Sequence, residues 1–172
     1  MAVIIPALNE EASIAEVVTV ARANEAGAET LAAGCGYGRA CLAGALASTD
    51  CDIVVFMDGD GADDPSAIGR LVEPITRGEQ DFVIASRARG SREPGSMSWH
   101  QLVAGRLAGV AIGLLYGVRY TDMCALRAIR RDALLALGMR ELTYGWNIEM
   151  QMRAAAMGLR ILEIPVDYHC RT

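Results

Sequence analysis

Apolar and polar residues follow each other in blocks along the chain, and these blocks predict strands and helices in alternation. Short, mainly apolar runs at 3–6, 52–57 and 81–85 are typical of strands that are buried on both faces. A last strand is expected over 160–168. The order predicts an α/β fold with a mostly parallel sheet and helices on both faces.

Six segments between and after these strands carry helix signals. Asn9 can cap the first helix, Pro65 falls in the first turn of the third, and Gly158 ends the last. The expected helices cover 9–23, 36–48, 64–75, 99–117, 130–138 and 146–158.

Composition narrows the class of protein. The 172 residues are 52% hydrophobic and 22% charged, which indicates one folded domain with a core. The net charge of −5 and the lack of a basic run argue against a nucleic-acid partner. All sixteen basic residues are arginine, so no mechanism that needs a lysine can operate.

The cysteines and apolar segments bear on location. Five cysteines without a C-x-x-C pair favour a reducing cytoplasm, and the N-terminus does not resemble a signal peptide. The apolar segment 102–118 is interrupted by Arg106 and is short for a membrane span, so we expect a buried or membrane-surface helix there.

Polar clusters follow the expected strands. Asp58 and Asp60 come directly after the run 54–57, and Ser86 and Arg87 follow the third strand. Ligands of open α/β sheets bind beyond the carboxyl ends of the strands. Two carboxylates one residue apart suit Mg²⁺ or Mn²⁺, and the alternative is a solvated acidic turn. An EF-hand is excluded, because Gly69 stands where its last glutamate is required.

The glycine-rich segment 34–44 precedes an expected helix. Such a loop lets backbone N–H groups approach a phosphate or ribose, and the alternative is a helix N-terminus packed tightly on the sheet. Arg87 and Arg127 are candidates for binding an anion.

Trp146 and Glu149 lie three residues apart on one expected helix. Both side chains can point into a cleft, or Trp146 anchors the helix while Glu149 pairs with Arg153. The residues alone do not decide between the two arrangements.

Six motifs in order carry a resemblance to a known family. The segments IIPALNEE, GYGRACLAG, VVFMDGDGADDP, FVIASRARG, RAIRRDAL and YGWNIEMQMRAAAMGLRILEIPVDYHCR together resemble a family 2 glycosyltransferase of the GT-A fold. The most similar branch is the dolichol-phosphate mannosyltransferase or polyprenyl-phosphate glycosyltransferase group. The resemblance covers nearly the whole chain and implies a single GT-A, nucleotide-diphospho-sugar transferase domain over 1–172.

The resemblance also implies roles for individual residues. It implies that Asp58 and Asp60 hold Mg²⁺ or Mn²⁺ against a diphosphate, and that catalysis at the sugar and acceptor falls to Arg87, Arg127 and Glu149. The residues expected to bind the nucleotide sugar are Pro6, Ala7, Leu8, Asn9, Glu10, Gly36, Gly38, Arg39, Asp58, Gly59 and Asp60.

The implied reaction is inverting transfer of a sugar from a UDP- or GDP-linked donor to a polyprenyl phosphate. The acceptor would bind near 97–118 at the inner face of the cell membrane, and a homodimer is a further expectation. A hydroxyl acceptor would need a base, for which Glu149 and Asp122 are candidates. The alternatives are a soluble acceptor, a phosphatase of the haloacid-dehalogenase type, and a non-catalytic nucleotide-binding module.

The chain departs from the family in three ways. No second acidic strand end follows the first helix, so we expect a segment to be missing near Val18–Thr19. Ala62 stands where the mannosyltransferase branch has a glutamine, so Asp63 or water must substitute. The family's acceptor loop would follow Thr172, where this sequence stops.

Overall fold

The computed structural model describes residues 1–7, 18, 36–91, 93, 95–96 and 99–170. The strands are β1 (Ala2–Ile4), β2 (Ile53–Phe56), β3 (Phe82–Ser86), β4 (Arg127–Arg130) and β5 (Ile161–Pro165). The helices are α2 (Tyr37–Ala47), α3 (Ile68–Thr76), α4 (Trp99–Tyr116), α5 (Arg131–Leu137) and α6 (Trp146–Ala156), and a 3-10 turn (Pro65–Ala67) precedes α3.

The five strands form one sheet in the order β1-β2-β4-β3-β5. β1 pairs parallel with β2 and β3 with β5, whereas β4 lies antiparallel between β2 and β3. Four of the five strands therefore point the same way, which confirms the predicted mostly parallel sheet. β4 was not predicted, because its sequence RAIR has arginine at both ends and only two apolar residues between them.

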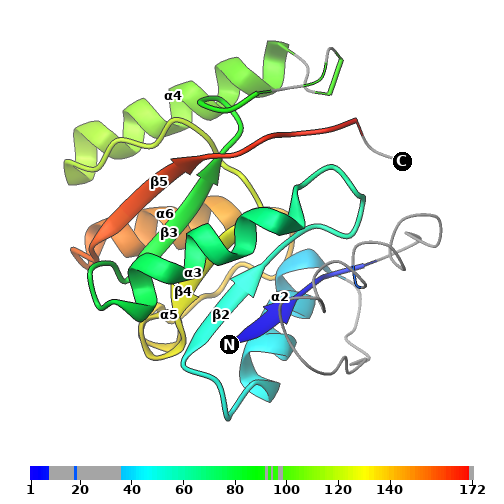
Figure 1. Cartoon of the computed structure of the whole chain (residues 1–172). Coiled ribbons are helices and arrows are strands. Elements are labelled where there is room, and N and C mark those ends of the chain that lie inside the picture. Colours follow the sequence, from blue (N-terminus) through cyan, green and yellow to red (C-terminus); the bar gives the residue numbers. More distant parts are fainter. Residues whose placement is uncertain (8–17, 19–35, 92, 94, 97–98, 171–172) are drawn as a thin grey trace.

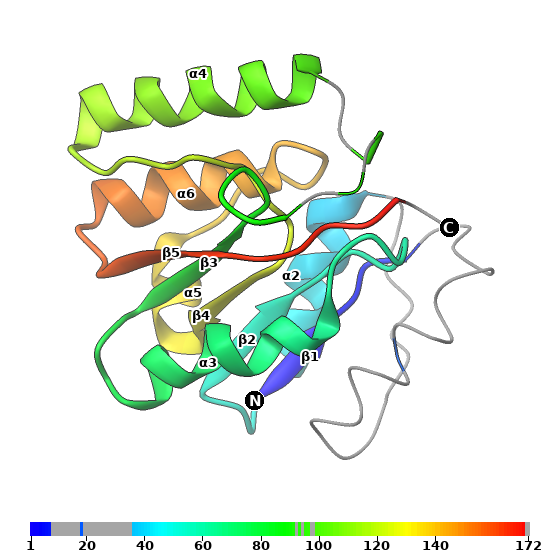
Figure 2. The same cartoon turned by 45° about the horizontal axis from the view of Figure 1, so that its top comes forward.

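Helices cover both faces of the sheet, as predicted. α3 packs across β2, β3 and β4 on one face. α2, α5 and α6 lie on the other face, and α4 packs along α6 as the outermost helix (Figures 1 and 2). The carboxyl ends of β2, β3 and β5 are thereby left at one edge of the sheet, between the helical layers.

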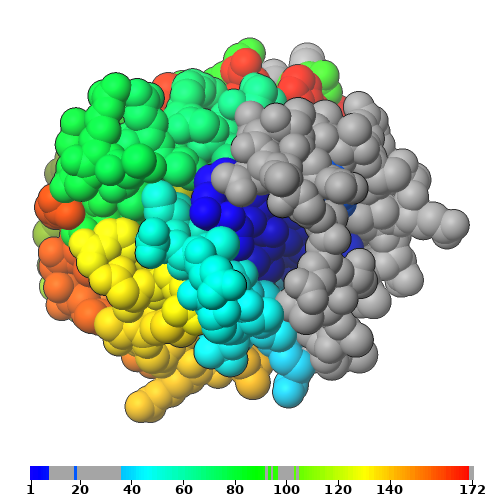
Figure 3. All heavy atoms as spheres, turned by 60° about the horizontal axis from the view of Figure 1, so that its bottom comes forward, coloured from blue at the N-terminus to red at the C-terminus, as the bar shows by residue number. Residues whose placement is uncertain are grey.

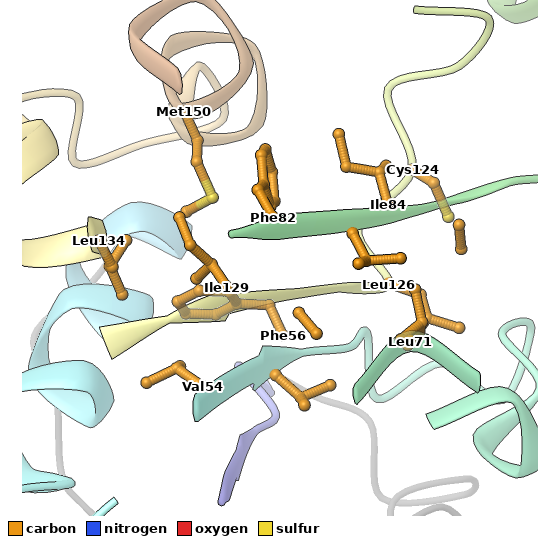
Figure 4. Packing of buried hydrophobic residues seen from close by; sticks show 14 of the residues in the cluster. Val54, Phe56, Leu71, Phe82, Ile84, Cys124, Leu126, Ile129, Leu134 and Met150 are labelled. Atoms are coloured by element: carbon orange, nitrogen blue, oxygen red, sulfur yellow. The ribbon is translucent and has the colours of Figure 1, made fainter. Parts of the chain in front are cut away.

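The core lies on both faces of the central strands. Phe56 meets Trp146 edge to face, with ring centroids 6.0 Å apart, and both side chains are fully buried. Met150 of α6 points toward Phe82 on the same side, as Figure 4 shows. This packing fixes the start of α6 over the end of β2.

The periphery is less covered. The blue N-terminal residues, β1 among them, reach the surface in Figure 3, in keeping with the place of β1 at the edge of the sheet. Along α4, Leu107 is 65%, Leu114 84% and Leu115 70% exposed. Within the part of the chain that the structure describes, no helix is both long enough and apolar enough to cross a membrane.

Candidate functional site

The end of β2 turns two carboxylates off the sheet edge. Met57 is fully buried, and its N–H donates to the carbonyl oxygen of Ile4 at 3.2 Å. Asp60 is 9% exposed and accepts a hydrogen bond from the N–H of Ala62 at 3.1 Å. The turn depends on Gly61, whose φ of 75° is in the left-handed region that favours glycine.

A third carboxyl group lies beside these two. Asp63 is 5% exposed, its Oδ1 is 3.7 Å from the Cys124 Sγ, and its Oδ2 has no hydrogen-bond partner among the described residues. Burial, and then the nearby charge of Asp58, raise the pKa of Asp63 to about 7, with Asp60 adding to the shift and Arg87 opposing it. The sequence pointed to Asp63 only as a substitute for a missing ligand.

The donor chemistry of this edge fits a hard divalent cation. A positive ion beside Asp58 and Asp60 would offset the two negative charges that add to the effect of burial on the pKa of Asp63. Mg²⁺ is commonly bound by one or two carboxylates beside substrate phosphates. Among the described residues, no group of three or more His, Cys, Asp or Glu side chains is arranged to hold a metal alone.

Tyr37 joins helix α2 to the acidic loop. Its hydroxyl donates to the Oδ1 of Asp58 at 3.0 Å. Burial, and then the charge of Asp58, raise the pKa of Tyr37 well above its ordinary value. The hydroxyl therefore keeps its proton and stays a donor. Nothing in the sequence singled out Tyr37, which is 21 residues from Asp58.

The glycine-rich segment packs tightly, but at the start of α2 its partner is the backbone of 141–143 and not the sheet that the packing alternative predicted. The N–H groups of Gly38 and Arg39 donate to the carbonyl oxygens of Thr143 and Leu142, at 3.2 and 3.0 Å. A Cβ atom at Gly36 would lie 2.6 Å from the carbonyl oxygen of Leu142, and one at Gly38 would lie 2.6 Å from that of Glu141. Because these two positions have no side chain, the backbone of 141–143 can pack directly against them. The predicted nucleotide contacts of Gly36, Gly38 and the exposed Arg39 stay predictions.

Arg87 follows β3 and is held by a carboxylate and a ring. Its Nε and Nη2 donate to the two oxygens of Asp122, both at 2.8 Å. Its guanidinium also lies over the Tyr168 ring, 4.9 Å from the centroid. Asp122, which the sequence offered as a base, is only 4% exposed. The predicted catalytic role of Arg87 stays a prediction.

Arg127 lies in the core at the start of β4. Its side chain is fully buried, and it donates to the carbonyl oxygens of Ala125 at 3.2 Å, Asn147 at 3.1 Å and Cys124. The guanidinium thus ties the chain before β4 to the start of α6. Its predicted role at an acceptor phosphate stays a prediction.

Glu149 pairs with Arg153, whose Nε lies 2.7 Å from its Oε1, and Trp146 is buried in the core. The anchoring alternative for this pair is therefore confirmed. Glu149 also accepts from the N–H groups of Arg140 and Glu141, at 3.0 and 2.7 Å. It borders an open hollow of about 540 Å³ on the outward side of α6. Its predicted catalytic role is untested.

The predicted residues after β1 are described in part. Ile4 pairs with Phe56, so Pro6 and Ala7 leave the sheet at the same edge as the acidic loop. Leu8, Asn9 and Glu10 lie outside the described residues, as does the expected junction at Thr19.

Known structures identify the fold. The chain resembles crystal structures of glucosyl-3-phosphoglycerate synthase from Mycobacterium tuberculosis, one of them in complex with Mn²⁺, uridine-diphosphate-glucose and phosphoglyceric acid. That likeness has a TM-score of 0.67 and 21% identity, over 99% of this chain and 70% of the other. The sheet, its helical layers and the acidic edge thus define a protein of the GT-A glycosyltransferase fold.

Sequence relatives identify the family. The model of glycosyl transferase family 2 matches residues 29–138, and the chain belongs to that family. An uncharacterized glycosyltransferase of Mycobacterium tuberculosis is 34% identical over 142 residues, which are 80% of this chain and 61% of the relative. The undecaprenyl-phosphate mannosyltransferase of Micrococcus luteus is 33% identical over 126 residues, 68% of this chain. The chain spans 49% of that relative's length.

Proposed function

We propose that this chain is an inverting glycosyltransferase that moves a sugar from a UDP- or GDP-linked donor to a polyprenyl phosphate. The observation that carries the proposal is the gathering of Asp58, Asp60 and the raised-pKa Asp63 at the carboxyl edge of the sheet. Perturbed carboxyl groups in such a place are typical of functional sites. Membership of family 2 and the name of the Micrococcus luteus relative support the same reaction.

In this proposal Asp58 and Asp60 would hold Mg²⁺ or Mn²⁺. The ion would neutralise the negative charge that develops on the departing nucleoside diphosphate. The residues expected to bind the nucleotide sugar at positions 6–10, which follow β1 in the sequence, and 36–39, at the start of α2, would contact the nucleoside. Arg87, held by Asp122 and Tyr168, would orient the acceptor anion for attack on the sugar carbon.

The partners of the two candidate bases favour a phosphate acceptor over a hydroxyl. Asp122 already accepts from Arg87 through both oxygens and from the N–H of Met123. Burial works to raise the pKa of Glu149, but backbone N–H donors and Arg153 outweigh it and lower that pKa below its ordinary value. Both carboxylates are thus already occupied by hydrogen-bond donors of this chain, and a phosphate acceptor, which is an anion near neutral pH, does not need a base.

The exposed apolar side of α4 supports the membrane-surface part of the proposal. Leu107, Val110, Leu114 and Leu115 are each more than half exposed along this helix. We propose that this side of α4 lies against the inner face of the cell membrane, where a polyprenyl phosphate is anchored. A homodimer through the same side of α4 is the competing expectation, and binding to vesicles distinguishes the two.

The testing experiment is a transfer assay with matched acceptors. The full chain is incubated with UDP- and GDP-linked sugars and Mn²⁺, with either a polyprenyl phosphate or the corresponding polyprenol. We expect transfer to the phosphate only, and none with EDTA. Release of phosphate from simple phosphomonoesters would instead support the phosphatase. Nucleotide binding that ignores metal and yields no transfer would support the binding module, and transfer to a water-soluble acceptor would move the protein off the membrane.

A further inference from the structure

Tyr37 lies where the glycine-rich segment meets the acidic loop. We propose that Tyr37 is a positioning residue for the divalent ion, because its hydroxyl fixes the Asp58 carboxylate in the orientation that binds the ion. The inference rests on the proposed function for the presence of the ion. It adds a side chain that neither the family resemblance nor the motif spacing assigned.

The position of Tyr37 is set by a well-anchored helix. Tyr37 is the first residue of α2, and the next two N–H groups donate to the carbonyl oxygens of Thr143 and Leu142. One turn on, Cys41 is fully buried, and at Gly44 an added Cβ would lie 2.8 Å from the Ile4 side chain. Backbone contacts at one end and close packing along the helix thus hold the Tyr37 ring in place.

Asp58 benefits from an outside donor because its neighbours repel it. Asp60 is two residues away, and the charge of Asp58 contributes to the raised pKa of Asp63. The hydrogen bond from the Tyr37 hydroxyl to Oδ1, at 3.0 Å, limits the rotation of the Asp58 carboxylate and so sets its orientation.

The chemical type of the partner also matters. Asp122 accepts hydrogen bonds from two guanidinium nitrogens of Arg87, the residue that follows β3, and this pairing neutralises the charge of Asp122. Tyr37 is a neutral donor, so its hydrogen bond orients Asp58 without placing a positive charge beside it. A carboxylate that is oriented but still charged is what a divalent ion requires, whereas an arginine would compete with the ion.

The test compares the removal of the Tyr37 hydroxyl with the removal of a buried tyrosine hydroxyl elsewhere in the same protein. Tyr37→Phe deletes the donor to Asp58. Tyr120→Phe is the control, because the hydroxyl of the buried Tyr120 donates to the backbone oxygen of Gln151 at 2.9 Å. Mn²⁺ alone is titrated into each full-length folded variant, and free Mn²⁺ is measured by electron paramagnetic resonance.

We expect Tyr37→Phe to weaken Mn²⁺ binding about 10-fold, because loss of the hydrogen-bond partner of a metal ligand commonly lowers metal affinity by at least about that factor. Tyr120→Phe should keep the dissociation constant within about twofold, since it touches no proposed ligand. Saturating Mn²⁺ should restore the kcat of Tyr37→Phe, because the tyrosine acts through the ion and not on the substrate.

Three outcomes would overturn the inference in distinguishable ways. Equal Mn²⁺ affinity in Tyr37→Phe and wild type would show that the hydrogen bond does not position Asp58. Equal weakening in both tyrosine variants would show a general loss of structure. A wild-type chain that transfers sugar but binds no Mn²⁺ would remove the metal from the proposed function, and the inference with it.

Discussion

Two aspartates at opposite edges of the sheet, Asp81 at the amino edge where β3 and β5 begin and Asp63 at the carboxyl edge where they end, have pKa values shifted in opposite directions. At the amino ends of β3 and β5, Asp81 accepts from Arg130 at 3.1 Å and Arg160 at 2.8 Å. The hydrogen bonds from Arg160 and the field of Arg130 lower the pKa of Asp81 to about 2. At the carboxyl edge, burial and the neighbouring carboxylates raise the pKa of Asp63 to about 7.

The contrast separates a stabilising edge from a functional one. Ion pairs at the amino edge fasten the starts of β3 and β5 and the end of β4 together. The carboxyl edge gathers negative charge that works against folding until a cation arrives. Arg87 pairs with Asp122 at the carboxyl edge, yet the charges of Asp58 and Asp60 still add to the raised pKa of Asp63, and we interpret this accumulated charge as a requirement of binding.

Among the tests of this contrast, we expect Asp60→Asn to have the largest effect. We expect transfer activity to fall at least about 100-fold, because an electrostatic partner of the developing charge is lost. The metal-free protein should unfold at the same temperature or higher, since a repulsive charge has been removed. Activity assays and thermal unfolding with and without Mn²⁺ measure both effects.

Asp64→Asn is the matched control, four residues further along the same loop. Asp64 caps the turn before α3 by accepting from the N–H of Ser66 at 2.9 Å, and asparagine caps equally well. This variant should keep its activity. Equal losses in the two variants would mean that the loop is merely sensitive to substitution.

Sequence patterns predicted those features that depend on neighbours in the chain. The apolar run before Asp58 predicted β2, and the position of Asp58 and Asp60 after it predicted the acidic edge. Parallel pairing of β1 with β2 then brings Pro6 to that edge without any information beyond strand direction.

Features that depend on distant partners could not be predicted. Tyr37 and Asp58 are 21 residues apart, and no local pattern marks a tyrosine as a donor to a particular carboxylate. β4 was missed for a related reason, since Arg127 is buried only because carbonyl groups from α6 and the preceding loop satisfy it. From sequence alone, a strand that begins with arginine is more typical of a surface.

The second test concerns Arg127, the buried cation close to both the core and the acidic edge. Arg127→Met should destabilise the protein by about 3 kcal/mol, because backbone carbonyls lose their donors in a buried setting. Urea unfolding measures the loss. Arg130→Met, at the other end of β4 and 43% exposed in its side chain, should cost much less, because solvent screens its ion pairs. Similar losses would contradict the anchoring role of Arg127.

The third test predicts a substitution that stabilises the protein instead of destabilising it. Asp63→Asn should stabilise the metal-free protein by about 2 kcal/mol at pH 8. The unfolded Asp63 loses its proton near pH 4 and the folded one near about 7, so wild-type stability falls as pH rises through this window. The advantage of the variant should shrink toward pH 5 in unfolding experiments. A difference that is constant between pH 5 and 8 would show that charge is not its cause.

The smallest effect belongs to the amino edge. Asp81→Asn should destabilise the protein by about 1 kcal/mol at pH 7, because the side chains of Arg130 and Arg160 are 43% and 50% exposed and solvent screens the pairs. The stabilisation by Asp81 is present above its unfolded pKa near 4 and is lost as pH falls toward about 2. Added salt should narrow the gap between the two proteins, whereas transfer activity should stay unchanged. A loss of activity without a loss of stability would show that Asp81 contributes to the reaction, and it would contradict the division into a stabilising edge and a functional edge.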